Sequence, residues 1–541
     1  MSAPQSTVYV CSGVRLDARY VNSIYFGTRA AQEAYFAGKV SRTFSACTYL
    51  RKTWPLQLQA TMEQAKAWNY LYFQNGSGKV YYYFINQIEY KNDSCIILHL
   101  ELDVLQTYLF DMTLLPSFIE RQHTTTDAVG DNTIDEGLDV GELTNNKVQH
   151  FGNYRLCIMV MCSINPNSTD STAAETRALP YMYNGVYSGV KIWAIHPDKW
   201  QAWGNQIETL DELGVTDAIL AMWMYPMSMV KLPDGVEWLG TDIAVPVEAA
   251  YTEDEALAAW SLGTPPDNVN GYTPKNKKLL CYPYCFAYAT DNQGGSAVYR
   301  YERFTDRVCS FVMSGSLSPD GGMHMTPLNY NGVEKNYHEG MTLSGFPTCA
   351  WDSDTYKLWL AQNQNQNTNS LRTAGAKVLA GAALAIGGAA ATTTGVGAIP
   401  GGAGVATGGG MIISGLQDIA GQLAQRHDRD VEPPQAKGNF SSSVNITNDE
   451  HCFTFYHKSC TAETAKTIDD FFTMFGYKIN RVQTPNINAR PAFTYVKTRA
   501  CNLQGNMCNE DILKVCSIFD NGITWWTSGD KIGDYSQSNT V

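Results

Sequence analysis

The chain has 541 residues, of which 44% are hydrophobic, 12% aromatic and only 17% charged. This length allows two to four domains. The low charged share, together with 31 Tyr residues, favours β-rich structure with large contact surfaces. The net charge of −13 argues against tight binding to the phosphate backbone of nucleic acids, although an acidic surface suits a channel through which DNA must slide without sticking.

The cysteines indicate the compartment in which the protein is made. The sequence holds 14 Cys and no C-x-x-C pair. The closest spacings, Cys157/Cys162 and Cys281/Cys285, match no standard zinc pattern. We therefore expect reduced, buried thiols in a protein made in a cytoplasm. The first ten residues contain neither the basic nor the apolar region of a signal peptide, which argues against secretion by that route.

The N-terminal part of the chain contains the clearest strand signals. Alternating apolar residues predict a strand-like segment over Thr7–Tyr25, and a helix is predicted over Thr61–Leu71. Lys79–Tyr90 and Cys95–Phe110 are rich in aromatic and β-branched residues and flank the turn-forming sequence Lys91–Ser94. They predict a long β-hairpin, although the second arm could also begin a strand-to-helix transition.

Two polar groupings in this region are candidates for chemistry. His99, Glu101 and Asp103 could share one face of the second arm as a metal or acid–base cluster, but a polar face of a sheet is the favoured interpretation. The loop Thr124–Glu142 carries six acidic residues and no Lys or Arg. Its spacing fails the EF-hand pattern, so a solvated turn is favoured over an ion site. The six are Asp127, Asp131, Asp135, Glu136, Asp139 and Glu142.

The middle and the end of the chain mix both element types. Between Val148 and Pro274, apolar runs alternate with predicted helices, which indicates an α+β segment. These are the runs Leu156–Cys162 and Val190–Ile195 and the helices Pro197–Trp203 and Glu253–Leu262. A second β-meander is predicted over Leu279–Met313. The C-terminal predictions are helices Gly415–Arg426 and Thr461–Phe475, strands His451–Lys458, Lys478–Val482 and Phe493–Lys497, and a turn at Phe519–Gly522.

No local motif for catalysis is present. The sequence contains no phosphate loop, no H-E-x-x-H and no G-x-S-x-G. A Cys/His dyad or a pair of carboxylates brought together by the fold stays open as an alternative, the latter as a glycosidase. We expect no catalytic residue, no metal and no cofactor.

The segment Leu371–Ala424 is the most unusual part of the sequence. The 40 residues between Lys377 and Asp418 carry no charge, and they include 12 Gly, 10 Ala and 11 Val, Leu, Ile or Met. The segment could be a flexible linker, a buried helical hairpin of small residues, or a segment that is hidden and later delivered to a membrane. Exposing eleven aliphatic side chains would cost on the order of 15–30 kcal/mol as an upper bound, which excludes a free linker. Interior Gly disfavours a stable helix in water, so we expect irregular packing in a hidden place.

Several stretches resemble one known family. They are the segment Phe84–His123, the NTIDEGL sequence Asn132–Leu138, YPYC at Tyr282–Cys285, the segment Phe475–Gly505 and IFDNGIT at Ile518–Thr524. In this order and at this separation they resemble the tail knob proteins of the smallest short-tailed bacteriophages. The resemblance spans nearly the full chain and is weakest between Phe151 and Pro274.

The resemblance implies a fold class and a function. The fold would be α+β and β-rich, with β-barrel tube domains like the hub and tube modules of phage tails, an inserted α+β segment and a long apolar loop. Six copies would form a ring at the distal tip of the tail, and the loop of each copy would fill the lumen. After contact with the host, the loops would be expelled and form a pore in the cytoplasmic membrane for DNA. The loop residues concerned are Leu379, Leu384, Ile386, Val396, Ile399, Val405, Met411, Ile412, Ile413 and Leu416.

The implied partners are the other copies of a homo-hexamer, collar or nozzle and tip proteins of the tail, the host cytoplasmic membrane, and phage DNA that passes without specific binding. The protein would be made in the host cytoplasm and act in the virion tail tip at the host envelope. We divide the chain into a tube domain (1–125), an inserted α+β domain (126–275), a second tube region (276–360), the apolar loop with flanking helices (361–435) and a C-terminal part (436–541). The alternative is a tail protein that degrades cell wall or binds glycans, with its site in Val148–Pro274.

Overall fold

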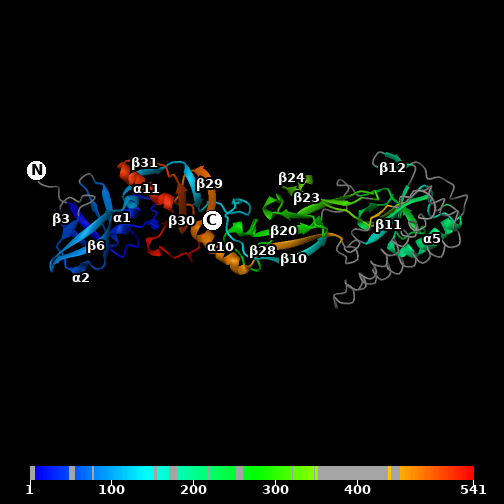
Figure 1. The fold of residues 1–541 in the computed structure, drawn as a ribbon. Helices are drawn as coiled ribbons and strands as arrows, with labels where there is room; N and C mark the ends of the chain where they lie inside the picture. The colour runs from blue at the N-terminus through cyan, green and yellow to red at the C-terminus, as the bar shows by residue number, and fades with distance from the viewer. Residues whose placement is uncertain are drawn as a thin grey trace. The chain divides into compact units, whose positions relative to one another are not determined.

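The computed structural model of the chain describes most residues outside the apolar segment (Figure 1). The described residues are 6–47, 55–75, 78–151, 155–169, 181–183, 186–188, 191–213, 215, 218–250, 260–319, 321–346, 348–350, 437–439 and 451–541. All statements below concern these residues. The ten predicted loop residues and the predicted helix Gly415–Arg426 lie outside them.

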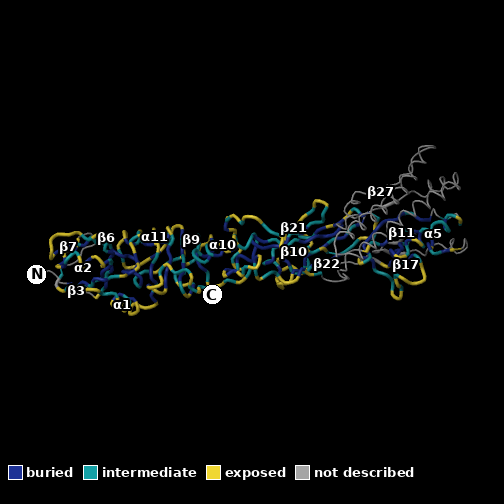
Figure 2. The backbone as a smooth tube through the Cα atoms, turned by 90° about the horizontal axis from the view of Figure 1, so that it is seen from below, coloured by how far each residue is buried: buried dark blue, intermediate teal, exposed yellow. Residues whose placement is uncertain are grey.

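The chain divides into two compact units, each built from several segments. Unit 1 contains Met1–Thr144, Asp267–Cys285 and Cys460–Val541, and unit 2 contains Asn145–Pro266 and Phe286–Ser459. In both units, the buried residues follow the strands and the exposed residues gather in the connections between them (Figure 2). The five-segment division by sequence stays a prediction.

The first sheet of unit 1 has six strands in the order β3-β1-β5-β6-β7-β4. All of its neighbouring strands run antiparallel. Their bounds are β1 Ser6–Ser12, β3 Val40–Cys47, β4 Leu56–Leu58, β5 Trp68–Gln74, β6 Val80–Asn92 and β7 Cys95–Leu102. The predicted hairpin is confirmed as β6 and β7, whose alternating aromatic and aliphatic residues form one face of a large core.

Three short helices pack around this sheet: α1 Arg29–Ala37, α2 Met62–Ala65 and α3 Val104–Tyr108. The predicted helix Thr61–Leu71 is wrong beyond Ala65, because Trp68, Tyr70 and Phe73 alternate into the core as part of β5. The second hairpin arm ends at Leu102 instead of Phe110. Asp103 caps α3 by accepting from the amides of Leu105 and Gln106, so a helix starts there.

The second sheet of unit 1 has the order β2-β32-β30-β9-β29, and β31 pairs with β8 beside it. The bounds are β2 Asn22–Ile24, β8 Met112–Leu114, β9 Ser117–Gln122, β29 Tyr477–Gln483, β30 Phe493–Arg499, β31 Leu503–Gly505 and β32 Ile523–Trp526. The predicted strands Lys478–Val482 and Phe493–Lys497 are confirmed as β29 and β30. The predicted strand-like segment Thr7–Tyr25 is confirmed only in part, as β1 and β2.

Two longer helices belong to the same unit: α10 Ala462–Phe475 and α11 Asn509–Asn521. The Thr461 side chain caps α10 by accepting from the amide of Thr464, which confirms the predicted helix. Phe519–Gly522 is not a loop turn. It is the last turn of α11, closed by Gly522 at a φ of 90°, a left-handed conformation that favours glycine.

Unit 2 contains three larger sheets. Their orders are β17-β14-β11-β15-β26-β27, β10-β28-β20-β21, and β19-β22-β23-β24 with β25 paired to β23. The pairs β12-β13 and β16-β18 complete it. The bounds of β10 to β18 are Leu143–Phe151, Leu156–Cys162, Tyr181–Tyr183, Val186–Ser188, Lys191–Ile195, Ile219–Pro226, Val230–Lys231, Ala244–Pro246 and Ala249–Ala250. Those of β19 to β28 are Trp260–Ser261, Cys285–Thr290, Ser296–Tyr299, Ser310–Gly315, Met323–Tyr330, Val333–Lys335, Met341–Leu343, Thr348–Ala350, Lys437–Asn439 and Phe453–Cys460.

The predictions for unit 2 are confirmed for its strands and corrected for its helices. The runs Leu156–Cys162 and Val190–Ile195 correspond to β11 and β14, and His451–Lys458 to β28. The helix predicted over Pro197–Trp203 starts as the 3-10 turn Pro197–Lys199 and continues as α5, Trp200–Glu212. The predicted helix Glu253–Leu262 lies mostly outside the described residues, and its end is strand β19. Other 3-10 turns in the chain are Met227–Met229, Lys277–Leu280, Tyr301–Arg303, Tyr337–Glu339 and Gly529–Lys531.

The architecture is therefore β-rich with few helices. The predicted meander over Leu279–Met313 is confirmed only as the hairpin β20–β21, since β22 belongs to another sheet and Leu279 lies in a 3-10 turn. The 13 cysteines whose side chains the structure describes are free thiols. Within the described ranges, no helix is long and apolar enough to cross a membrane.

Candidate functional site

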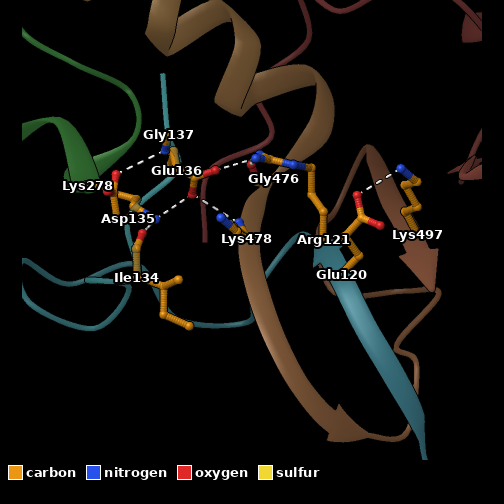
Figure 3. Close-up of polar contacts among 10 residues, drawn as sticks. All are labelled: Glu120, Arg121, Ile134, Asp135, Glu136, Gly137, Lys278, Gly476, Lys478 and Lys497. Atoms are coloured by element: carbon orange, nitrogen blue, oxygen red, sulfur yellow. Dashed lines mark hydrogen bonds and ion pairs between the residues drawn. The ribbon is translucent and has the colours of Figure 1, made fainter. Parts of the chain in front are cut away.

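A buried carboxylate, Glu136, connects three distant segments of unit 1 (Figure 3). Its side chain is fully buried and forms ion pairs with Arg121 at the end of β9 and with Lys278 in the 3-10 turn Lys277–Leu280. It also accepts a hydrogen bond of 3.0 Å from the backbone amide of Lys478 at the start of β29. Because the partners lie on β9, in the 3-10 turn and on β29, this one side chain fixes the loop of residues 124–142 to the sheet.

The cations of this cluster have further partners. Lys278 Nζ donates to the carbonyl of Ile134 at 2.6 Å and lies 5.4 Å from the centre of the Tyr477 ring. Arg121 donates through Nη1 to the carbonyl of Gly476 at 2.8 Å. Burial lowers the pKa of the Lys278 ammonium, and the attraction of Glu136 opposes that shift. The buried charges are thus paired and hydrogen-bonded, which is the condition under which burial of charge is tolerated.

A second buried carboxylate, Asp469 on α10, holds the segment that precedes the 3-10 turn. It accepts from the Tyr272 hydroxyl and the Lys275 amide, both at 2.7 Å. It also accepts from the amide of Asn276 at 3.0 Å and from its Nδ2 at 2.8 Å. Asp469 is 0% exposed, so these four donors replace all of its hydration.

Gly476 makes the close approach of α10 and β9 feasible. It adopts a φ of 64°, and a Cβ built on it would lie 2.4 Å from the carbonyl carbon and oxygen of Gln122. Only glycine fits a position that combines a positive φ with backbone contact on the Cβ side. The sequence FGYKINRV therefore carries a structural requirement at Gly476.

A pocket of about 430 Å³ opens next to the ion cluster. Glu120 on β9 pairs there with Lys497 at 2.8 Å and with Arg499 at 2.9 Å. The cations around the pocket and the cluster outnumber the carboxylates, although the chain as a whole is acidic. The pocket is lined by Phe118, Glu120, Arg121, Glu136, Lys478, Asn480 and Arg499.

The cluster and its pocket are suited to structural support rather than to catalysis. Both carboxylate oxygens of Glu136 are taken up by cations and an amide, so the group is not available as a general base. In the part of the chain that the structure describes, no group of three or more His, Cys, Asp or Glu could hold a metal ion. What the geometry does provide is a rigid connection between α10, β9 and β29.

The three polar residues of the second hairpin arm that were candidates for a metal or acid–base cluster have separate partners. His99, Glu101 and Asp103 form no common site: His99 contacts Glu89 at 3.0 Å, Glu101 pairs with Lys514 at 2.7 Å, and Asp103 caps α3. This confirms the polar-face interpretation for the first two, and it makes Asp103 a buried capping residue.

The description of Thr124–Glu142 as a solvated turn is wrong at two positions. Glu136 is buried, and the half-buried Asp127 accepts from the Tyr477 hydroxyl and from the Lys277 amide at 3.2 Å. Sequence reasoning missed both, because most of their partners lie about 140 to 350 residues away in the chain; Arg121, 15 residues from Glu136, is the exception. The NTIDEGL sequence was the available signal, since it contains Glu136.

Comparisons with known proteins agree with this architecture. The N-terminal residues 4–113 match the family described as the caudoviral major tail protein N-terminus. The solved structure of the bacteriophage C1 tail knob protein, gp12, has the same fold, with a TM-score of 0.65 over 99% of this chain and 100% of that one at 14% identity. The fold is thus that of a structural protein of a phage tail.

The particular family follows from residues 252–540, which match the family described as the tail knob protein gp9 of Bacillus phage phi29, C-terminal domain. The chain belongs to this family of tail knob proteins. It is 25% identical to tail knob protein gp9 of Bacillus phage phi29 and 26% identical to that of phage B103, in both cases over 99% of this chain and 98% of the relative. The relatives are structural tail proteins, in agreement with the expectation that this chain is not an enzyme.

Proposed function

We propose that six copies of this chain form a tube at the distal tip of the tail and that DNA passes through its lumen. Membership of the tail knob family and the match to a tail protein over residues 4–113 support this assembly. The net charge of −13 favours passage of DNA without adhesion. Collar or nozzle proteins would bind the proximal end of the tube and a tip protein the distal end.

The apolar loop Leu371–Ala424 is proposed to close the lumen before infection and to penetrate the host cytoplasmic membrane during genome ejection. The observation that carries this proposal is the run of 40 uncharged residues, with 11 aliphatic side chains, inside an otherwise polar chain. A ring of copies provides an interior in which these side chains are kept from water. The ten residues from Leu379 to Leu416 named above would form the apolar contacts.

The length of the loop suits a membrane. An arm of about 20 residues reaches roughly 30 Å as a helix and ~65 Å when extended, and the hydrocarbon core of a bilayer is ~30 Å thick. Lipid tails offer no hydrogen-bond partners to backbone groups, so the inserted loops would become helical or pair with one another. Small residues such as Gly381, Ala385 and Gly388 allow close approach between helices.

Deletion of residues 378–417 tests the proposal. We expect particles that assemble and adsorb normally but fail to deliver DNA. The matched control replaces the 11 aliphatic residues of the run by Ser and keeps its length; it should fail in the same way, because length without apolar surface does not insert. Normal infection by either variant would contradict the proposal.

A direct assay uses a peptide that covers Leu371–Ala424. It should release dye from liposomes, whereas the Ser-substituted peptide should not; an inert wild-type peptide over a wide pH range would contradict membrane insertion. Zymography on host cell wall tests the alternative. A zone of clearing would favour a wall-degrading protein with its site in Val148–Pro274.

A further inference from the structure

A small cavity of about 250 Å³ lies in unit 1 and shares no lining residue with the pocket beside Glu136. At roughly 30 Å³ per water molecule, this space is enough for a polyatomic ion with several waters. Its walls come from the residue after β9, the segment before the 3-10 turn, α10, the residue before β30 and the C-terminal segment. They are His123, Lys275, Asn276, Thr473, Arg490 and residues 536–540.

Among the described residues, the buried cation Arg490 in this wall has no ion-pair partner. The residue is 5% exposed. Its guanidinium makes one hydrogen bond within the described part of the chain, from Nη1 to the carbonyl of Asn539 at 3.3 Å, and its Nε has no partner there. Burial lowers the pKa of Arg490, but a guanidinium stays charged at neutral pH. Buried charges in proteins are normally paired, so this one indicates a missing anion.

The carboxylates near the cavity are already occupied by other donors. Burial lowers the pKa of Arg490 and the negative charge of Asp127 opposes that shift, but the two side chains form no ion pair among the described residues. The Asp127 oxygens accept from the Tyr477 hydroxyl at 2.5 Å and from the Lys277 amide at 3.2 Å. Asp469 is likewise occupied by its four donors, described above.

The His123 imidazole in this wall is neutral, and both of its ring nitrogens are hydrogen-bonded to the backbone. Its Nδ1 accepts from the Tyr495 amide at 2.8 Å, so the proton is on Nε2, which donates to the Thr473 carbonyl at 3.1 Å. Burial and the nearby Arg490 lower the pKa of His123 to about 3, so the ring is neutral at physiological pH. Lys275 adds a second, exposed cation at the rim. Among the described side chains that line the cavity, the charged ones are thus the cations of Arg490 and Lys275.

We propose that this cavity binds one small oxyanion of the inorganic phosphate class, held between Arg490 and the C-terminal segment. The guanidinium presents parallel N–H groups that match two oxygens of such an anion. Lys275 and the hydroxyls of Ser538 and Thr540 complete the set of donors at the mouth. This site is independent of the apolar loop and of membrane penetration.

Binding of the anion would also fix the C-terminal segment. Asn539 attaches this segment to the start of β30: its Oδ1 accepts from the amides of Ala492 and Phe493 at 3.0 and 3.1 Å, and its Nδ2 donates to the carbonyl of Phe493 at 2.9 Å. An anion that bridges Arg490 and the segment adds to these bonds. The amides of Ala492 and Phe493 should therefore exchange more slowly when the site is filled.

The test is titration of the full-length protein with inorganic phosphate at constant ionic strength, followed by calorimetry and by hydrogen exchange. We expect saturable binding of one phosphate per chain and slower exchange over residues 490–494. Arg490→Gln should weaken phosphate binding at least tenfold, and Lys275→Gln several-fold. Arg481→Gln, which changes an exposed residue of β29 outside the cavity, should bind like the wild type.

Stability separates the site from a purely structural arginine. If Arg490 is the ligand of an anion, Arg490→Gln should be no less stable than the wild type in phosphate-free buffer. The wild type should gain stability over the variant only when phosphate is added. Loss of stability in Arg490→Gln regardless of phosphate would instead show that Asp127 is its partner, and would overturn the proposal. Absence of saturable phosphate binding to the wild type, or equal binding by the Lys275 and Arg490 variants, would also overturn it. If acetate binds as tightly as phosphate, the site is for carboxylates, such as a side chain of another tail protein, and the phosphate assignment fails.

Discussion

Removal of the charge of Glu136 should loosen unit 1 around β29. In Glu136→Gln the side chain keeps its shape, but Lys278 and Arg121 then face a neutral amide in a place where the Glu136 side chain is 0% exposed. Breaking a buried pair by neutralising one partner costs about 3–5 kcal/mol, because the other charge stays buried. We expect a loss of that size.

The control is the neighbouring residue Glu120. Its side chain is 24% exposed and its partner Arg499 is 74% exposed, so solvent screens the pair. Glu120→Gln should therefore cost less than ~1 kcal/mol. Lys278→Met should cost less than Glu136→Gln, because Arg121 still pairs with Glu136, and the double variant should recover part of the loss as a positive coupling energy.

Hydrogen exchange is the appropriate assay, because a single free energy of unfolding is not well defined for a chain with two units. The Lys478 amide, which donates to Glu136, reports directly on the cluster. A loss of about 3–5 kcal/mol corresponds to exchange that is faster by roughly two to three and a half powers of ten over Tyr477–Gln483. If Glu136→Gln exchanges no faster than Glu120→Gln there, the cluster does not hold the sheet.

Two further predictions concern the same unit. Gly476→Ala should destabilise unit 1 by more than ~3 kcal/mol, because the added Cβ would contact the Gln122 backbone. The control Gly137→Ala, at a φ of 70° with open space around it, should cost only about 1–2 kcal/mol. Similar thermal unfolding midpoints of the two variants would contradict the contact. The depressed pKa of His123, about 3, means that the unfolded chain binds more protons between pH 6.5 and 3, so stability falls as pH decreases through this window. At pH 5 the free energy of unfolding should be lower by roughly 2 kcal/mol. Urea unfolding of His123→Gln should show a correspondingly weaker pH dependence. An unchanged pH dependence would assign the effect to other groups.

Much of the strand framework could be predicted from local patterns. The hairpin β6–β7, strand β11 and helix α10 were all predicted near their observed positions, because alternation of apolar residues, a turn sequence and a Thr cap are properties of neighbouring residues. Elements with weaker local signals were missed. α11 has no side-chain cap at Cys508, and α1, although capped by Thr28, buries few residues.

The burial of charge could not be predicted in the same way. Glu136 and Asp127 are part of a loop with six acidic residues, which by sequence alone is typical of a solvated turn. Glu136 is buried and Asp127 half-buried because cations, amides and hydroxyls from residues 277–278 and 477–478 reach them in the fold. A local pattern contains no information on such distant partners.

The β-rich class and the need to keep the uncharged run away from water could be inferred from the sequence alone, since they follow from composition and transfer free energy. The resemblance to tail knob proteins was carried by particular motifs. Which buried charges are neutralised and which are not became visible in the folded structure. Glu136 pairs with two cations on other elements of unit 1, whereas Arg490 is enclosed without an ion-pair partner among the residues that the structure describes. Pairing of buried charge depends on distances between segments far apart in the chain, and these distances exist only once the chain has folded.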